Sequence, residues 1–138
     1  MSAYETDDLI DRAIVVATEA RHRAYVPYSH FRVGAAVATA DGLIFAGANV
    51  ENASYGLTVC AERIALWSAT VTGATDFPLI VIVTDTAQPV APCGACRQVL
   101  FELAPDAVVV MSTLGGVRRV TTVPELLPGA FGKGDLSL

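Results

Sequence analysis

Two short cysteine motifs constrain the fold of this chain more than any other feature, because residues that bind one metal ion must meet in space. The first is Cys60-Ala61-Glu62-Arg63, and the second is Pro92-Cys93-Gly94-Ala95-Cys96-Arg97. Together they contain all 3 cysteines of the protein. Three thiolates can hold a zinc ion and leave its fourth tetrahedral position open for water, as in catalytic rather than structural sites. The sequence therefore predicts a zinc site formed by Cys60, Cys93 and Cys96.

The acidic residue of the first motif, Glu62, lies beside the predicted open position and need not bind the metal itself. An activated water and an adjacent proton carrier are the parts of a hydrolytic zinc enzyme. One residue separates Cys60 from Glu62, so both side chains can face one point only at a helix N-terminus, where they extend past the first turn. The motif thus predicts that Glu62 is catalytic and that a helix begins at Cys60.

Other interpretations of these motifs stay open. The cysteines could hold a structural zinc or remain buried thiols, and Glu62 could be an acid that only stabilises a helix N-terminus. His22 and His30 could in principle supply a fourth ligand, although their surroundings favour exposed side chains. Three thiolates leave a zinc site with net negative charge. We therefore predict that Arg63 and Arg97, which follow motif residues, donate to the sulfurs and withdraw that charge.

Composition limits the possible partners. The chain has 138 residues, which suits a single domain over residues 1–138, and 53% of them are hydrophobic. No apolar run approaches the roughly 18 residues that cross a bilayer, so we expect copies of the chain, and not a membrane, to cover part of this apolar surface. A net charge of −5 favours a small-molecule substrate over nucleic acid, which needs a basic surface. An odd number of cysteines without an export signal favours reduced thiols in the cytoplasm.

Hydrophobic periodicity predicts an α/β fold. Apolar residues at helical spacing indicate a first helix that begins near Thr6 and that Pro27 ends, and two more over residues 60–72 and 93–103. Apolar and β-branched runs indicate strands over residues 32–39, 43–48, 78–84, 107–111 and 117–122. A short helix over 122–127 and a tail over 131–138 follow. This order predicts a three-layer α-β-α sandwich with a mixed five-stranded sheet.

Further stretches carry a resemblance that covers nearly the whole chain. They are Tyr25-Val26-Pro27-Tyr28-Ser29, Phe31-Arg32-Val33-Gly34-Ala35, Asn49-Val50-Glu51-Asn52-Ala53-Ser54-Tyr55 and Leu126-Leu127-Pro128-Gly129-Ala130-Phe131. With the two cysteine motifs, this set resembles the small homotetrameric cytidine deaminases, zinc-dependent members of the cytidine and deoxycytidylate deaminase superfamily. The resemblance implies their fold, one Zn²⁺ per subunit, and a homotetramer with sites shared between subunits.

The resemblance also implies roles for individual residues. Cys60, Cys93 and Cys96 would bind zinc, and Glu62 would pass protons from water to the pyrimidine ring nitrogen and to departing ammonia. The implied substrate contacts are ribose hydrogen bonds from Asn49 and Glu51, a ring contact from Phe31, base recognition by the backbone of Ala61, and completion of a neighbouring subunit's pocket by Tyr55 and Phe131. The carboxylate of Glu51 would repel a phosphate, which favours a nucleoside over a nucleotide. Alternatively, Phe31 is a core residue, and Asn49 and Glu51 satisfy turns.

The leading hypothesis is hydrolytic deamination of cytidine and 2′-deoxycytidine to uridine and 2′-deoxyuridine, with release of ammonia, in pyrimidine salvage. An enzyme acting on modified cytosine nucleosides, including blasticidin-type antibiotics, is an alternative, but the pair Asn49 and Glu51 favours ordinary ribose. A non-catalytic interaction domain stapled by zinc is a third interpretation, and it leaves Glu62 and the open metal position without a purpose. Editing of nucleic acid is disfavoured by the acidic charge balance.

Overall fold

The computed structural model describes residues 3–136, with side chains from residue 6 onward. The last two residues of the predicted tail lie outside this range. The described elements follow one another in the order α1 (Ala3–Arg21), β1 (Val33–Ala38), β2 (Ile44–Ala48), η1 (Tyr55–Leu57), α2 (Ala61–Thr70), β3 (Leu79–Thr84), α3 (Gly94–Leu103), β4 (Val108–Thr113), β5 (Arg118–Thr122), α4 (Val123–Leu126) and η2 (Lys133–Leu136). Within the described part of the chain, no helix is both long enough and apolar enough to cross a membrane.

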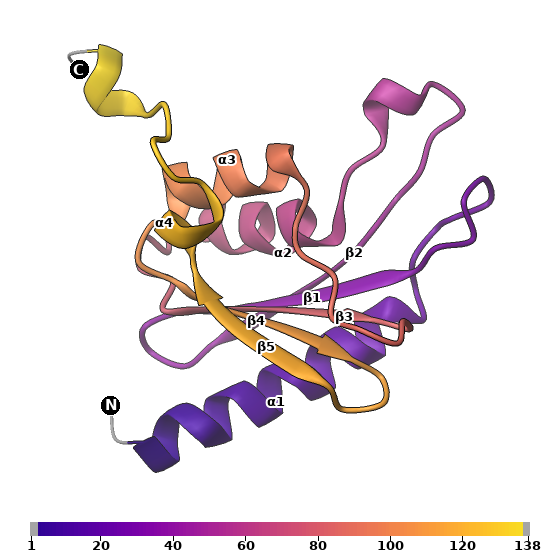
Figure 1. Cartoon of the computed structure of the whole chain (residues 1–138), viewed down its shortest axis with the longest axis horizontal. Coiled ribbons are helices and arrows are strands. Elements are labelled where there is room, and N and C mark those ends of the chain that lie inside the picture. Colours follow the sequence, from indigo (N-terminus) through magenta and orange to yellow (C-terminus); the bar gives the residue numbers. More distant parts are fainter. Residues whose placement is uncertain (1–2, 137–138) are drawn as a thin grey trace.

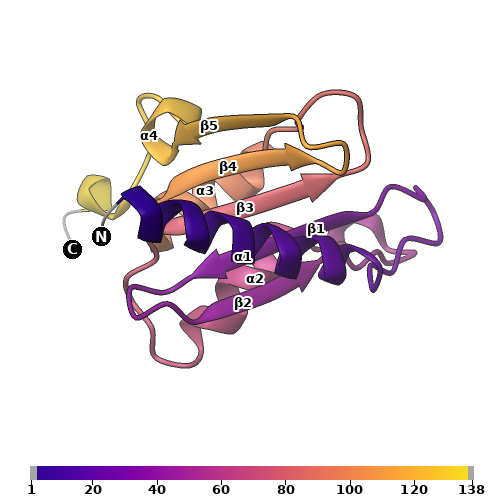
Figure 2. The same ribbon diagram turned by 90° about the horizontal axis from the view of Figure 1, so that it is seen from below.

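The five strands form one mixed sheet with the order β2-β1-β3-β4-β5. The central pair β3 and β4 is parallel, and every other neighbouring pair is antiparallel. One face of the sheet is covered by α1, and the opposite face by α2 and α3 (Figure 1). The view from below shows α1 lying across the sheet (Figure 2). The predicted α-β-α sandwich with a mixed five-stranded sheet is thus confirmed.

Strand β3 shows why the sequence folds into three layers. All of its residues, Leu79–Thr84, are buried, as its continuous apolar run predicted. Alternate side chains point to opposite faces of a strand. Accordingly, Val81 and Val83 pack in the cluster beneath α1, whereas Ile80 and Ile82 pack in the cluster beneath α2 and α3. The face shared by Ile80 and Ile82 is therefore the one from which a side chain can reach the two cysteine helices.

The prediction that the first helix continues to Pro27 is wrong, because α1 ends at Arg21. After that point the backbone pairs with a distant segment: the amide of Tyr25 donates to the carbonyl of Asn49 at 2.9 Å, and the amide of Glu51 donates to the carbonyl of Tyr25 at 2.9 Å. These bonds satisfy groups that a continued helix would have used internally. They also bring residues 25–31 beside residues 49–51, two of the stretches that carry the family resemblance.

Candidate active site

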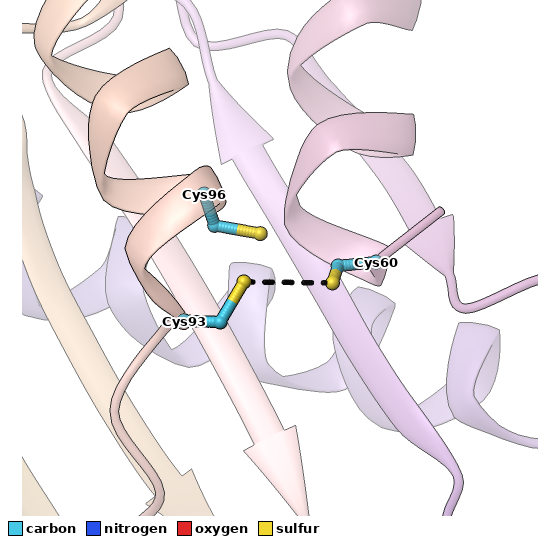
Figure 3. Close-up of side chains that lie close together, drawn as sticks. All are labelled: Cys60, Cys93 and Cys96. Atoms are coloured by element: carbon cyan, nitrogen blue, oxygen red, sulfur yellow. Dashed lines mark hydrogen bonds between the residues drawn. The ribbon is translucent and has the colours of Figure 1, made fainter. Parts of the chain in front are cut away.

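The three cysteines come from the N-termini of two helices that lie side by side on one face of the sheet. Cys60 and Cys93 are the N-cap residues of α2 and α3, both with extended backbone angles, and Cys96 lies in the first turn of α3. Figure 3 shows the three side chains directed toward one another. The sulfurs of Cys60 and Cys93 are 3.8 Å apart, and all three sulfurs lie within 4.8 Å of one another.

This spacing fits a tetrahedral zinc ion. Zinc–sulfur bonds of about 2.3 Å at tetrahedral angles place two sulfurs about 3.8 Å apart. Three such sulfurs occupy three corners and leave the fourth open. Among the described residues, no His, Asp or Glu joins this cluster, and His22 and His30 are exposed elsewhere, as predicted. The donor set therefore matches an open zinc site rather than one closed by a fourth side chain.

The electrostatics of the sulfurs also favour a bound cation. Hydrogen bonding from Cys96, with a contribution from Arg63, lowers the pKa of Cys60 to about 5. The pKa of Cys96 is raised, because its thiol donates to Cys60 and is desolvated. One thiolate thus makes a second thiolate beside it unfavourable. A divalent metal ion removes this conflict, because it interacts favourably with all three thiolates at once.

The two arginines differ in their contacts. Arg63 Nη2 lies 3.4 Å from the sulfur of Cys60 and donates to it, while the guanidinium lies over the ring of Trp67 at 5.8 Å. The predicted sulfur contact of Arg97 is wrong: its Nε donates to the carbonyl of Pro92 at 2.7 Å and its Nη1 to the carbonyl of Leu126 at 2.9 Å. Carbonyls at the end of the preceding loop and in α4 lie within its reach. Arg97 therefore holds the second motif in place instead of tuning its charge.

Glu62 lies in the first turn of α2, immediately after the cap formed by Cys60. Its side chain is buried, with 6% of the residue exposed. Burial raises the pKa of Glu62, and the negative charge of the Cys60 thiolate raises it further. A buried carboxyl group with a raised pKa, at a cavity that cysteines also line, is a feature of functional sites. Glu62 is therefore a candidate proton carrier.

A cavity of about 210 Å³ brings together half of the predicted site residues. Its wall includes Phe31, Asn49, Cys60, Ala61, Glu62 and Cys93, all of them predicted from the sequence. Sequence analysis missed the remaining lining residues, which are Val33, Thr58, Ile82, Thr84, Val90 and Ala91. Period-two alternation along β3 could have found two of them, because Ile82 and Thr84 point to the face that carries the cysteine helices. Cys96 is fully buried behind this wall.

Asn49 and Glu51 make structural hydrogen bonds within the chain. Asn49 accepts from the amide of Val33 at 2.9 Å and donates to the carbonyl of Phe31 at 2.8 Å. Glu51 accepts from the amides of Tyr28 and Ser29, at 3.0 and 3.1 Å, and from the Ser29 hydroxyl. The hydroxyl bond is the main reason that the pKa of Glu51 is lowered. Both residues therefore satisfy turns, as the alternative interpretation held, and their sugar contacts stay predictions.

The two aromatic residues assigned to a neighbouring subunit's pocket lie outside the cavity of their own chain. Tyr55 is 74% exposed and packs edge-on against Tyr28, with ring centroids 5.8 Å apart. Phe131 is 60% exposed and is tied to α3 by a 2.8 Å bond from Gln98 Nε2 to its carbonyl. Tyr55 and Tyr28 line a hollow beside Glu51, and Thr58 lines both this hollow and the cavity of Glu62. The two spaces are therefore adjacent.

Comparisons with known proteins agree with this geometry. The family model described as the cytidine and deoxycytidylate deaminase zinc-binding region matches residues 8–112. A curated relative, the cytidine deaminase of Halalkalibacterium halodurans, is 53% identical over 131 residues, which cover 93% of this chain and 99% of the relative. The crystal structure of cytidine deaminase from Burkholderia pseudomallei is 49% identical, with a TM-score of 0.85 over 95% of this chain and 100% of that one. Blasticidin-S deaminase of Bacillus cereus is 37% identical and covers 83% of this chain and 86% of its own length.

Proposed function

The chain belongs to the cytidine and deoxycytidylate deaminase family, and from this membership we propose that it hydrolyses the 4-amino group of cytidine and 2′-deoxycytidine. The products are uridine, 2′-deoxyuridine and ammonia. The observation that carries the proposal is a cluster of three cysteine sulfurs, two of which belong to residues that line one cavity together with the buried Glu62. A purely structural metal site has no use for a buried acid that is not a ligand.

The chemistry divides between the metal and Glu62. Zinc held by Cys60, Cys93 and Cys96 would supply Lewis acidity, which lowers the pKa of water and so provides a nucleophile at neutral pH. Glu62 accepts a proton from the attacking water and delivers it to the ring nitrogen N3. The same carboxyl group then carries a proton to the departing amine. Burial raises the pKa of Glu62, which favours the protonated form that the transfers to N3 and to the amine require.

The two adjacent spaces support a nucleoside as the substrate. A ligand with its base in the cavity of Glu62 can extend past Thr58 into the hollow beside Glu51. The lowered pKa of Glu51 keeps it ionised at neutral pH, so that it accepts hydrogen bonds from sugar hydroxyls and repels a phosphate. Phe31 is 42% exposed, which leaves its ring available to flank a base. Asn49, which lines the cavity of Glu62, would contact the sugar from that side.

We extend the proposal to a homotetramer that acts in pyrimidine salvage in the cytoplasm. Tyr55 and Phe131 are exposed aromatic side chains, and large exposed aromatic residues are enriched where subunits meet. In the assembly each of them completes a neighbouring subunit's site. Sedimentation of the purified protein tests the stoichiometry, and mixing a Phe131→Ala variant with a Glu62→Gln variant tests whether sites are shared.

One experiment decides the proposed activity. Purified protein, with zinc measured per chain, is incubated with cytidine, and ammonia release is followed. We expect turnover of cytidine and 2′-deoxycytidine, and little turnover of the 5′-phosphates. A protein that holds one zinc per chain and releases no ammonia from either nucleoside refutes the activity. Blasticidin S is included as a substrate, because the similarity to a blasticidin-S deaminase makes it the competing candidate.

A further inference from the structure

The cavity has a polar wall residue that the chemistry above does not use. Thr84 is the last residue of β3, is 1% exposed, and lines the cavity together with Cys60, Glu62 and Cys93. It lies two residues after Ile82, so its side chain points to the face covered by the cysteine helices. A buried hydroxyl at a ligand cavity constrains which ligand groups can lie against it.

Hydrogen bonding fixes which way this hydroxyl points. Thr86 Oγ1 donates to the carbonyl of Gln88 at 2.6 Å, and Thr84 Oγ1 lies 2.8 Å from Thr86 Oγ1. A threonine hydroxyl has one hydrogen to donate and two lone pairs to accept with. Because the hydrogen of Thr86 is used on Gln88, the bond between the two threonines must be donated by Thr84. The chain therefore runs from Thr84 to Thr86 to Gln88.

The consequence is that Thr84 can offer the cavity only an acceptor. Its single hydrogen is engaged by Thr86, while its lone pairs remain available to a ligand. Cytosine carries an N–H donor at position 4, and uracil carries a carbonyl acceptor there. An oxygen that cannot donate a hydrogen bond therefore binds the 4-amino group of cytosine favourably and leaves the 4-carbonyl of uracil without a partner.

We propose that Thr84 is a specificity-determining residue whose hydroxyl oxygen accepts from the 4-amino group of the substrate and disfavours the 4-carbonyl of the product. Thr86 is a positioning residue, because it acts only by engaging the hydrogen of Thr84. This inference rests on the proposed function, since it presupposes a cytosine nucleoside in the cavity. It adds a preference for substrate over product that acts at position 4 of the ring.

Binding measurements test the proposal without depending on turnover. In a Glu62→Gln background loaded with zinc, calorimetry gives the dissociation constants of cytidine and uridine. Thr84→Val keeps the side-chain shape and removes the acceptor, so cytidine binding should weaken about threefold to tenfold, the size of one neutral hydrogen bond, while uridine binding stays the same or tightens. Thr86→Val frees the hydrogen of Thr84 to rotate toward the ligand, so uridine binding should tighten severalfold.

A matched control makes the same substitution away from the cavity. Thr18 lies in α1 and donates to the carbonyl of Ile14 at 2.7 Å, so Thr18→Val should leave both constants unchanged. Thermal midpoint and zinc content confirm that each variant is folded. The proposal is overturned if Thr84→Val weakens the binding of cytidine and uridine equally. It is also overturned if Thr86→Val leaves the ratio of their dissociation constants at its original value. Failure of the proposed function is a separate result: the protein with Glu62 intact releases no ammonia from cytidine, whatever the binding ratio.

Discussion

The close contact between β2 and α2 gives the sharpest prediction about the active site. Gly47 lies in β2, beneath the first turn of α2, and its α-carbon faces the helix backbone. A Cβ atom added at Gly47 would lie 2.3 Å from the carbonyl oxygen of Ala61 and 2.5 Å from the amide nitrogen of Ala65. Ordinary contacts of this kind begin near 3.4 Å. Since both neighbours are backbone, Gly47→Ala must displace the start of α2 by about 1.1 Å, from 2.3 to 3.4 Å.

This displacement acts directly on the site, because the displaced turn carries Cys60 and Glu62. Overpacking of this kind lowers stability by about 1–3 kcal/mol. A shift of about 1 Å in a catalytic group can reduce the rate on the order of a hundredfold. The variant should therefore hold less zinc per chain and, at saturating zinc, show kcat/KM on cytidine reduced by roughly two orders of magnitude. Steady-state kinetics and metal analysis of the same samples measure both.

Gly115→Ala is the matched control for this prediction. A Cβ at Gly115 would meet only the hydroxyl of Thr113, at 3.8 Å, so the same chemical change introduces no overlap. It should leave zinc content and kcat/KM unchanged. If Gly47→Ala folded with full zinc content and kcat/KM within about twofold of the parent, the argument that backbone contact positions α2 would be refuted.

Five further substitutions each test a single side chain. Glu62→Gln should retain zinc and lose about 10²–10⁴-fold in turnover. In metal-free protein the same change should raise the denaturation midpoint at neutral pH, because the raised pKa of Glu62 makes the parent lose stability as pH rises above the ordinary value of 4.5. Below that pH the difference in midpoint between variant and parent should disappear. Cys93→Ala should lose zinc and lower the thermal midpoint, and chelator should then cause no further decrease. Arg63→Gln should reduce kcat about 10–100-fold, whereas Arg97→Gln should mainly lower the thermal midpoint, since its donors engage carbonyls. Glu51→Ala should raise KM for cytidine. In the parent, the contribution of Glu51 to loop stability is present above pH 4.5 and is lost as pH falls, because the pKa of Glu51 is lowered. Titration of the loop amide signals measures this loss of stability.

The sequence was sufficient to predict the layers and the sulfur cluster, because both depend on patterns with a local physical cause. The uninterrupted apolar run of β3 has to be buried on both faces, and a Cys-x-x-Cys pair at the start of a helix places two sulfurs on one side. Cys60 and Glu62 could be assigned to a helix N-terminus for a similar reason. The structure confirms this assignment: Cys60 is the N-cap of α2 and Glu62 lies in its first turn.

Features that depend on distant partners could not be predicted. The end of α1 is set by pairing of Tyr25 with Asn49 and Glu51, which lie far along the chain. Arg97 was assigned to the sulfurs because it follows Cys96, but the carbonyl of Leu126, brought near by α4, offers a better acceptor. A motif identifies which residues are close in sequence to a metal, and the acceptors that surround each side chain are known only once the chain is folded.

The two helices that carry the sulfurs are held by different contacts, and this bears on how the site forms. The start of α2 is fixed by its backbone contact with β2 at Gly47, whereas α3 is tied by Arg97 to the loop before it and to α4. Neither set of contacts involves the metal. Together these contacts bring the three sulfurs within 4.8 Å of one another. Packing of the sheet and helices therefore directs the N-termini of α2 and α3 to one point, where Cys60, Cys93 and Cys96 can hold zinc and leave its fourth position open for chemistry.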